Sequence, residues 1–408
     1  MSEPPPQAAP PSETPDEPAP SLAARFALYQ RAGGIITPLL TALLAFFIGG
    51  LVVLVTTGKN PLETYKAIFN GTGLNWFFPW VTGTERDLAA EDLQQTLILT
   101  TTLILVGIAV AFAFRCGLFN IGGPGQYIAG MIAASQVGIL MPDLAHVPHI
   151  VLAAGAGALA GAVWGGIAGI LKAVAGVHEV IATIMLNWIA IWIGSYLVGF
   201  EGPLQDPAQV FVPVTEEVSD GAKLDVFWGP PAPQGLHIGF FVAIAALVVF
   251  WLVINRTTLG FQVRAVGFNP EAARYSGIGV GRNFFLAMGI SGAFAGLAGS
   301  MDILGWLFRV DLTSVQISSQ IAFIGIAVAL LGRNTPLGVF FGALLFGALI
   351  NGASTRNLDP AVFEPELAGN LTLIIQGLVV LFVGADLLIL YVWRLRRKIR
   401  RKTPEPAA

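Results

Sequence analysis

The sequence predicts an all-α membrane protein that crosses the bilayer about ten times. Hydrophobic residues make up 55% of its 408 residues and charged residues only 12%, whereas an ordinary soluble domain carries about 25% charge. The mean hydropathy is accordingly high, at +0.72. A soluble protein of this length needs more charged surface to stay dissolved, so the composition excludes the soluble fold classes.

Ten apolar windows are long enough to cross a bilayer, which takes about 20 residues. They lie at about residues 33–56, 93–114, 118–140, 150–171, 179–199, 238–254, 283–304, 317–332, 336–352 and 367–391. Glycine and polar residues at the starts of the third and eighth windows indicate that these two helices could be broken or re-entrant.

The chain divides into three parts. Residues 1–30 are rich in proline and acid and are expected to be disordered. They lack the basic start and apolar centre of a signal peptide, so the first apolar window is expected to remain as a membrane anchor. Residues 31–392 form the transmembrane domain, and residues 393–408 form a basic tail.

The positions of Lys and Arg predict the side that each loop faces. The last window is followed by RLRRKIRRK, and loop 255–282 holds four arginines against one acid, so both are expected in the cytoplasm. The loops 57–92 and 200–236 are net acidic and are expected outside. Because ten is an even number of spans, both termini are expected in the cytoplasm.

An inverted repeat of about five helices is also indicated. GPGQYIAGMIAASQVG, from Gly123, is similar to SSQIAFIGIAVALLG, from Ser318, and a glycine-rich window follows each copy. A glutamine, Gln126 or Gln320, is expected to open each helix, and with ten spans these two helices run in opposite directions. Glycine-rich helices also resemble each other by composition alone, so both interpretations stay open.

Small residues at every fourth position predict close packing between helices. The fourth window carries Gly157, Gly161, Gly165 and Gly169, and the seventh carries Gly292, Gly296 and Ser300. A loose dinucleotide-binding pattern begins at Gly155, but no strand precedes it, so helix packing is favoured.

Motifs for catalysis, metal binding and nucleic-acid binding are missing from the sequence. One cysteine and four scattered histidines exclude a disulfide scaffold and zinc-ligand spacing, and the net charge of −3 gives no basic excess for nucleic acid. The sequence contains no Walker A, zincin or nucleophile-elbow motif. We therefore expect no enzyme activity, no catalytic or metal-binding residue and no cofactor on this chain.

Ionisable residues within the apolar windows are few, namely Glu179, Asp302 and Asp386. Each lies near the end of its window, where an interfacial or capping role is favoured over ion coupling. A chain without charge at the membrane centre is a poor candidate for a proton-coupled or sodium-coupled transporter, although it can pass a neutral solute.

Uncharged polar residues are better candidates for lining a path through the membrane. Asn120 and Gln126 flank a glycine cluster in which Pro124 should interrupt helical hydrogen bonding and expose backbone groups. Asn187 lies in the middle of an apolar window. The alternative role for each amide is an interhelical hydrogen bond worth about 1 kcal/mol. For Asn187 this role and path lining are equally favoured, and for Asn120 path lining is favoured.

Loop 255–282 contains the start and stop signals of a short exposed helix. Proline is favoured at the first helical position, as in Asn269–Pro270, and an acid such as Glu271 is favoured in the first turn. Gly277 can end the helix. An ordinary basic cytoplasmic loop would explain the arginines but not these signals, so a docking element is favoured.

RAVGFNPEAARYSGI in this loop resembles the coupling segment, with its EAA motif, of the integral membrane subunits of ABC importers. The resemblance is to the permease family that serves branched-chain amino acids, simple sugars and nucleosides. FRCGLFNIGGPGQ is similar to another run of that family, although Pro124 stands where relatives carry glutamate. NPLETYKAIFNGTG, ATIMLNWIA and SGAFAGLAG resemble the nucleoside branch. The similarity covers about residues 30–390.

The resemblance implies a permease subunit of an ABC importer in the plasma (inner) membrane, with nucleosides or related simple sugars as solutes. Separate ATP-binding subunits would bind ATP and Mg²⁺ and receive the helix around Asn269 in a surface groove. Further partners would be membrane lipid, a second permease subunit, identical or homologous, and an extracytoplasmic solute-binding protein that docks on the acidic outer loops. No nucleic-acid partner is implied.

Two sets of residues are expected to carry this function. The junction with the ATP-binding subunit would contain Arg264, Asn269, Pro270, Glu271, Ala272, Ala273, Arg274 and Gly277. The translocation path would contain Phe119, Asn120, Gln126, Asn187 and Gln320. Branched-chain amino acids or other sugars remain alternative solutes. A stand-alone facilitator or secondary transporter is an alternative mechanism, and a membrane enzyme is disfavoured.

Overall fold

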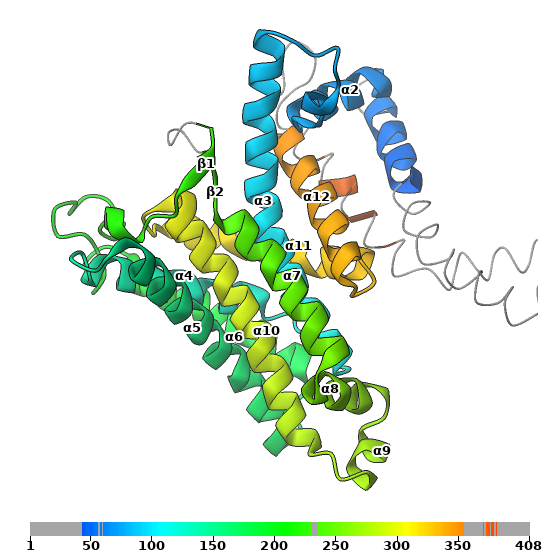
Figure 1. Ribbon diagram of the computed structural model, residues 1–408, viewed down its shortest axis with the longest axis vertical. Helices are drawn as coiled ribbons and strands as arrows, with labels where there is room; N and C mark the ends of the chain where they lie inside the picture. The colour runs from blue at the N-terminus through cyan, green and yellow to red at the C-terminus, as the bar shows by residue number, and fades with distance from the viewer. Residues whose placement is uncertain are drawn as a thin grey trace, which may run out of the picture.

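In the computed structural model, long helices pack around one central helix, α3 (Thr84–Arg115), as Figure 1 shows. The structure describes residues 43–55, 58, 60–229 and 235–354, and beyond them only residues 370, 373–375, 377–378 and 381. The proline-rich residues 1–30, the basic tail 393–408 and most of the window at 367–391 lie outside the described residues.

The described elements are almost all helical. The other long helices are α4 (Gly123–Leu140), α5 (His146–Ala175), α6 (Glu179–Val198), α7 (Gly239–Arg256), α10 (Val280–Asp302), α11 (Leu312–Leu331) and α12 (Pro336–Gly352). The shorter ones are Leu43–Val55, α2 (Pro61–Gly71), α8 (Thr258–Phe268) and α9 (Pro270–Tyr275). Single turns form η1 (Leu74–Phe77), η2 (Asp220–Ala222) and the π-helix η3 (Ile303–Leu307). An antiparallel hairpin joins β1 (Val226–Trp228) to β2 (Leu236–His237).

Six helices in the described ranges are long and apolar enough to cross a membrane: α3, α5, α6, α7, α11, and α10 with η3. The helix Leu43–Val55 and α12 are apolar but shorter. Helix α4 occupies the window predicted at 118–140, but it carries Pro124, Gln126 and Gln136 and is not among the six. The helical, multi-span class is confirmed, while the count of ten spans and the inverted repeat stay predictions.

Helix α3 is central because it is apolar on every side, which is typical of a fully buried helix. Its side chains from Leu103 to Ala113 have essentially no exposed surface, and α7, α10, α11 and α12 pack against it. At about 1.5 Å per residue its 32 residues span about 48 Å, more than the hydrocarbon thickness of about 30 Å. Its polar first turns, with Glu85 and Asp87, therefore extend beyond the membrane core.

The predicted glycine stripes of α5 and α10 face each other. A Cβ atom added at Gly161 would overlap the carbonyl oxygen of Gly292, and one added at Gly292 would overlap that of Gly161. Helix α4 joins the contact, because a Cβ atom at Gly130 would overlap the backbone of Gly296. The prediction of close helix packing is confirmed, and it includes a third helix.

Helices α4 and α11, the two copies of the expected repeat, begin differently. The chain before α4 is not helical, and Gln126 lies in the first turn, as expected. Helix α11 begins at Leu312, because Asp311 and Ser314 form a capping box there. Gln320 is therefore in the middle of an unbroken helix, and the expectation that it opens one was wrong.

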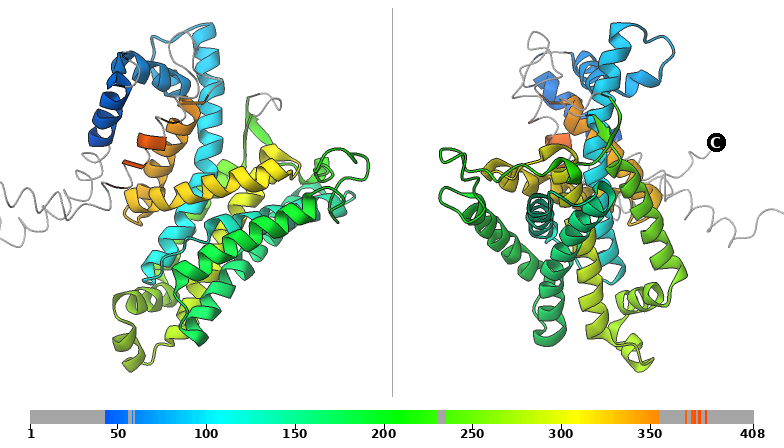
Figure 2. Two further views of the ribbon diagram at one scale, coloured as in Figure 1. Left: turned by 180° about the vertical axis from the view of Figure 1, so that it is seen from behind. Right: turned by 60° about the vertical axis from the view of Figure 1, so that its left-hand side comes forward.

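The loops of opposite charge lie at opposite ends of the helices. Figures 1 and 2 show α8 and α9 at one end, and α2 with the β1–β2 hairpin at the other. These ends correspond to the basic loop 255–282 and to the acidic loops 57–92 and 200–236. The arrangement places the candidate docking helix far from the candidate outer surface.

Candidate functional site

Helix α9 forms where its start and stop signals predict it. The side-chain oxygen Oδ1 of Asn269 accepts hydrogen bonds from the N–H groups of Glu271 (3.0 Å) and Ala272 (3.1 Å), and Pro270 is the first helical residue. Gly277 follows with a φ of 79°, in the left-handed region that favours glycine. Both predicted ends are confirmed.

The outer surface of α9 carries charged side chains that are largely exposed. Glu271 and Arg274 are 70% and 67% exposed and lie 3.6 Å apart, while Ala273 is buried and fixes the helix to the protein. Arg264 lies on the preceding helix α8, where its Nε donates to the Gly260 carbonyl (3.3 Å). This arrangement presents a short rigid helix with charges free to meet another surface.

Two exposed aromatic residues, one just before the N-cap of α9 and one at its last position, were not singled out from the sequence. Phe268 is 91% exposed and Tyr275 is 93% exposed. Aromatic side chains are enriched at the energetic centres of protein interfaces. Their positions directly beside the capping residues Asn269 and Ser276 could have drawn attention to them. However, an apolar residue just before an N-cap often packs against the first turns of its own helix, as a hydrophobic staple.

Helix α8 is seated on the chain that leaves α3. A Cβ atom added at Gly267 would overlap the carbonyl oxygen of Arg115, and one added at Gly117 would lie 3.2 Å from the Gly267 Cα. Val263 and Val266 of α8 are fully buried. The docking element and the end of α3 therefore pack backbone against backbone.

The segment after this junction, Leu118–Gly122, is the predicted break before α4. The amide of Asn120 bridges it to α10, with Nδ2 donating to the Ser291 hydroxyl (2.7 Å) and Oδ1 accepting from the Gly122 N–H (2.8 Å). Nδ2 also donates to Gln126 Oε1 (2.9 Å), and Gln126 Nε2 returns a bond to Asn120 Oδ1 (3.2 Å). Asn120 has no exposed surface and Gln126 only 1%.

Asn187 of α6 holds the same break from the other side. Its Oδ1 accepts from the Gly125 N–H (2.9 Å), and its Nδ2 donates to the Ile121 carbonyl (2.9 Å). These bonds satisfy backbone groups that the interrupted helix leaves unpaired. For Asn120 and Asn187 the structure therefore contains the interhelical hydrogen bonds that were the alternative to lining a path.

The remaining path candidates lie apart from this amide cluster. Phe119 is half-buried and stacks on Phe114, with ring centroids 5.0 Å apart. Gln320 is exposed on α11. Closer to the cluster is Trp164 of α5, whose Nε1 would lie 2.8 Å from a Cβ atom at Gly125. This indole has no hydrogen-bond partner in the described part of the chain, and no spacing in the sequence pointed to it.

Asp302, the last residue of α10, is buried within the protein. It is 1% exposed, and its carboxylate accepts hydrogen bonds from the hydroxyls of Thr102 on α3 and Tyr127 on α4. A buried carboxyl needs such partners. Asp302 thus joins three helices, and its partners are too distant in sequence for a spacing rule to reveal them.

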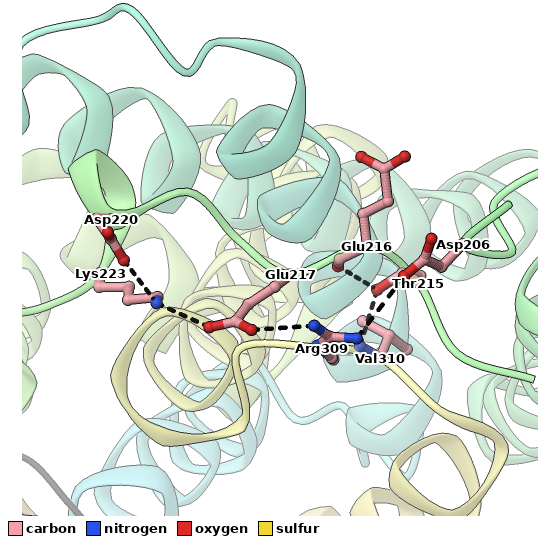
Figure 3. A network of polar contacts seen from close by, with 8 residues as sticks. All are labelled: Asp206, Thr215, Glu216, Glu217, Asp220, Lys223, Arg309 and Val310. Carbon is pink, nitrogen blue, oxygen red and sulfur yellow. Dashed lines mark hydrogen bonds and ion pairs between the residues drawn. The ribbon is translucent and has the colours of Figure 1, made fainter. Parts of the chain in front are cut away.

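The outer loop between α6 and α7 is attached to the turn between α10 and α11 through ion pairs (Figure 3). Arg309 lies 3.1 Å from Glu217 and 3.7 Å from Asp206, and Lys223 lies 2.8 Å from Glu217 and 2.7 Å from Asp220. Hydrogen bonds from Lys223 and Arg309 lower the pKa of Glu217. Part of the acidic charge predicted for this loop is therefore neutralised within the protein.

Comparison with known proteins agrees with this architecture. Residues 93–384 match the family described as branched-chain amino acid transport system, permease component. The guanosine ABC transporter permease protein NupP of Bacillus subtilis is 36% identical over 91% of this chain and 99% of its own. The nucleoside permease NupB of Lactococcus lactis is 32% identical over 87% and 92%, and the glucose permease TsgB13 of Haloferax volcanii is 34% identical over 85% and 86%. No solved structure matches.

The matched range contains most of α3, the break before α4, the glycine contact and the capped helix α9. Permeases of this kind form the membrane part of the importer, and ATP is hydrolysed by partner subunits. The chain belongs to the branched-chain amino acid transport system permease family and is a membrane-spanning permease subunit of an ABC importer.

Proposed function

We propose that this permease carries nucleosides across the membrane. The observation that carries the proposal is the similarity to NupP and NupB, whose names specify guanosine and nucleosides, over nearly the full length of each protein. A neutral base and sugar also suit a membrane domain whose polar groups near the chain break are uncharged amides.

A simple sugar is the second candidate, because the glucose permease TsgB13 is almost as similar. The two solutes can be separated by reconstituting the chain with its ATP-binding subunits and binding protein in liposomes. We expect labelled guanosine to accumulate only with ATP, and unlabelled guanosine to compete better than glucose. Preferential ATP-dependent uptake of glucose would contradict the nucleoside assignment, and uptake without any ATP-binding subunit would indicate a facilitator.

Helix α9 is proposed to dock into a groove of the ATP-binding subunit, with Arg264, Glu271 and Arg274 making polar contacts. Its caps, its exposure and the aromatic residues beside it support this role. Deleting residues 269–276 should abolish coupled uptake. In a milder test, Phe268→Ser and Tyr275→Ser should each lower solute-stimulated ATP hydrolysis by about tenfold, the loss of about 1.4 kcal/mol of interface energy, without changing the thermal stability of the isolated permease.

The break before α4 is proposed to line the translocation path, with Asn120, Gln126 and Asn187 holding its backbone in place and Phe119 beside it. Such irregular backbone is tolerated at membrane depth where it is packed in protein or lines a wet cavity. Gln320, exposed on α11, would face the path or the second permease. Accessibility to a thiol reagent after Ile121→Cys, compared with Leu186→Cys, would test which backbone faces water during turnover.

The remaining assignments concern topology and partners. We propose ten spans arranged as an inverted repeat, with both termini in the cytoplasm and the solute-binding protein on the acidic outer loops. Packing of α4 on α5 and of α11 on α12 supports related halves. ATP and Mg²⁺ would be held by the partner subunits. Cysteines placed in loops 57–92 and 255–282 should label from opposite sides of sealed membranes.

A further inference from the structure

An apolar groove of about 720 Å³ runs between α7 and α12 on the lateral surface of the bundle. Its lining includes Leu247, Val248 and Trp251 of α7 and Leu337 and Phe340 of α12. Several of these side chains are open to the surroundings: Val248 is 52%, Trp251 41% and Leu337 74% exposed. The groove is within the size range of pockets that hold small ligands, about 300–1,000 Å³.

One end of the groove carries positive charge. The guanidinium of Arg256 lies over the Trp251 ring, 5.3 Å from its centroid. The N-terminus of α12 opens at the same end, since Thr335 and Pro336 line the groove and Thr335 caps the helix. Arg115 adds a third positive group, because its guanidinium donates to the carbonyl of Asn334 (2.6 Å), the residue before Thr335.

Within the three described helices nearest the groove, no acidic residue opposes these charges. The described residues of α7, α8 and α12 contain neither Asp nor Glu. Helix N-termini and arginine guanidinium groups both favour anions such as phosphate. Aromatic residues such as Trp251, with arginine beside them, are typical of the level where lipid headgroups meet the hydrocarbon core.

The few described residues of the predicted last window pack elsewhere. Residue 375 belongs to the window predicted at 367–391, and Ile375 is fully buried. Its side chain would lie 2.8 Å from a Cβ atom at Gly49, so it packs on the helix Leu43–Val55. Figure 1 shows this helix beside α12 on the side away from α7.

We propose that the groove between α7 and α12 binds an anionic phospholipid, with an acyl chain against Val248 and Trp251 and the phosphate between Arg256 and the N-terminus of α12. The site is in the leaflet on the side of α8 and α9. It does not depend on which solute the permease carries, and because α7 leads directly into α8, the lipid would lie next to the docking element.

Native mass spectrometry of the full-length permease can test the proposal with dioleoyl phosphatidylglycerol and dioleoyl phosphatidylcholine as probes. We expect the anionic lipid to bind in preference, and Arg256→Gln to reduce that preference about fivefold, as removal of one arginine contact worth about 1 kcal/mol would. Arg282→Gln removes an exposed arginine at the start of α10 and should leave it unchanged.

A groove-filling variant separates the lipid from other occupants. Val248→Trp should weaken retention of both lipids without changing the number of permease subunits in the complex. In proteoliposomes, brominated phosphatidylglycerol should quench the native protein more than the Trp251→Phe variant. Equal binding of the two lipids, or an unchanged preference in Arg256→Gln, would overturn the proposal. Loss of subunit association in Val248→Trp would show a protein interface there instead.

Discussion

Helix α9 and the chain break before α4 are both polar features of a largely apolar protein, but they are held in opposite ways. The residues that start and stop α9 lie within a few positions of one another, and its charged side chains are exposed. The break is buried, and its hydrogen bonds come from α6 and α10. The exposed helix can therefore change partners at little cost to stability, whereas the break cannot change without disturbing several helices.

The contact of Gly267 with the end of α3 connects the two regions, so a side chain there should have the largest effect. A Cβ atom at Gly267 would overlap the Arg115 carbonyl, and backbone cannot move aside as a flexible side chain can. We expect Gly267→Val to destabilise the permease by about 1–3 kcal/mol, as overpacking does, and to abolish coupled uptake.

Thermal unfolding in detergent and uptake in liposomes measure the two effects of Gly267→Val. Gly155→Ala is a matched control, because a Cβ atom there has nothing within 4 Å. A Gly267→Val variant with native stability and uptake would show that the docking element and the end of α3 are not coupled through this contact.

Asn120→Ala should have the next largest effect, since it removes the side chain that pairs with the buried Gly122 N–H and with the buried amide of Gln126. Unsatisfied buried groups cost about 1–3 kcal/mol. The loss should appear as a lower unfolding temperature even without ATP-binding subunits. Asn255→Ala removes an exposed amide that bonds within its own helix and should be nearly neutral. Equal stability of the two variants would contradict the bracing role of Asn120.

The two regions also differ in how much of them the sequence could predict. Both ends of α9 were predicted, because Asn269, Pro270 and Gly277 act locally on the backbone. The break before α4 was predicted from Pro124 and its glycines, but the partners of Asn120 and Asn187 were not. Hydrogen bonds across 171 and 62 residues leave no pattern in a single sequence.

Other features show the same limit. The glycine stripes predicted close packing, and the structure added which helices meet. The hydrogen bond between Thr102 and Asp302 could not be predicted, because nothing in the sequence relates two residues 200 positions apart. Gln320 was assigned to a helix start by its similarity to Gln126, whereas the capping signal at Asp311 and Ser314 is further upstream. Local capping chemistry is the more reliable guide to a helix boundary than similarity between apolar segments.

Asn269→Ala should have a smaller effect that is confined to α9. Removing an N-cap costs about 1 kcal/mol, and here the loss affects a helix that makes few contacts with the bundle. Hydrogen exchange should increase at Glu271 and Ala272, because their N–H groups donate hydrogen bonds to the Asn269 side chain. The free energy of global unfolding should be unchanged. Asn269→Asp keeps the acceptor and should keep protection. A large fall in global stability would mean that α9 belongs to the core.

The smallest effect is expected from the outer ion pairs. Those of Lys223 join residues of one loop, as the α9 caps do, whereas those of Arg309 join segments distant in sequence, as the hydrogen bonds of the break do. The pKa of Glu217 is lowered by hydrogen bonds from Lys223 and Arg309, so its contribution to stability is present above its unfolded pKa, about 4.3. This contribution is lost as pH falls through the lower folded pKa. Arg309→Gln should cost no more than about 1 kcal/mol at pH 7, since the pairs are partly exposed.

The difference in stability between native protein and Arg309→Gln should shrink as pH falls below about 4, because protonated Glu217 no longer pairs with Arg309. Thermal unfolding at low and neutral pH measures it, and added salt should reduce it in the same way. Lys66→Gln, an exposed cation of the other acidic loop, is the control. A pH-independent difference would mean that Arg309 holds the loop by packing and not by charge. An uncharged contact between the same two segments already exists, because the Thr215 N–H donates to the Val310 carbonyl (2.9 Å).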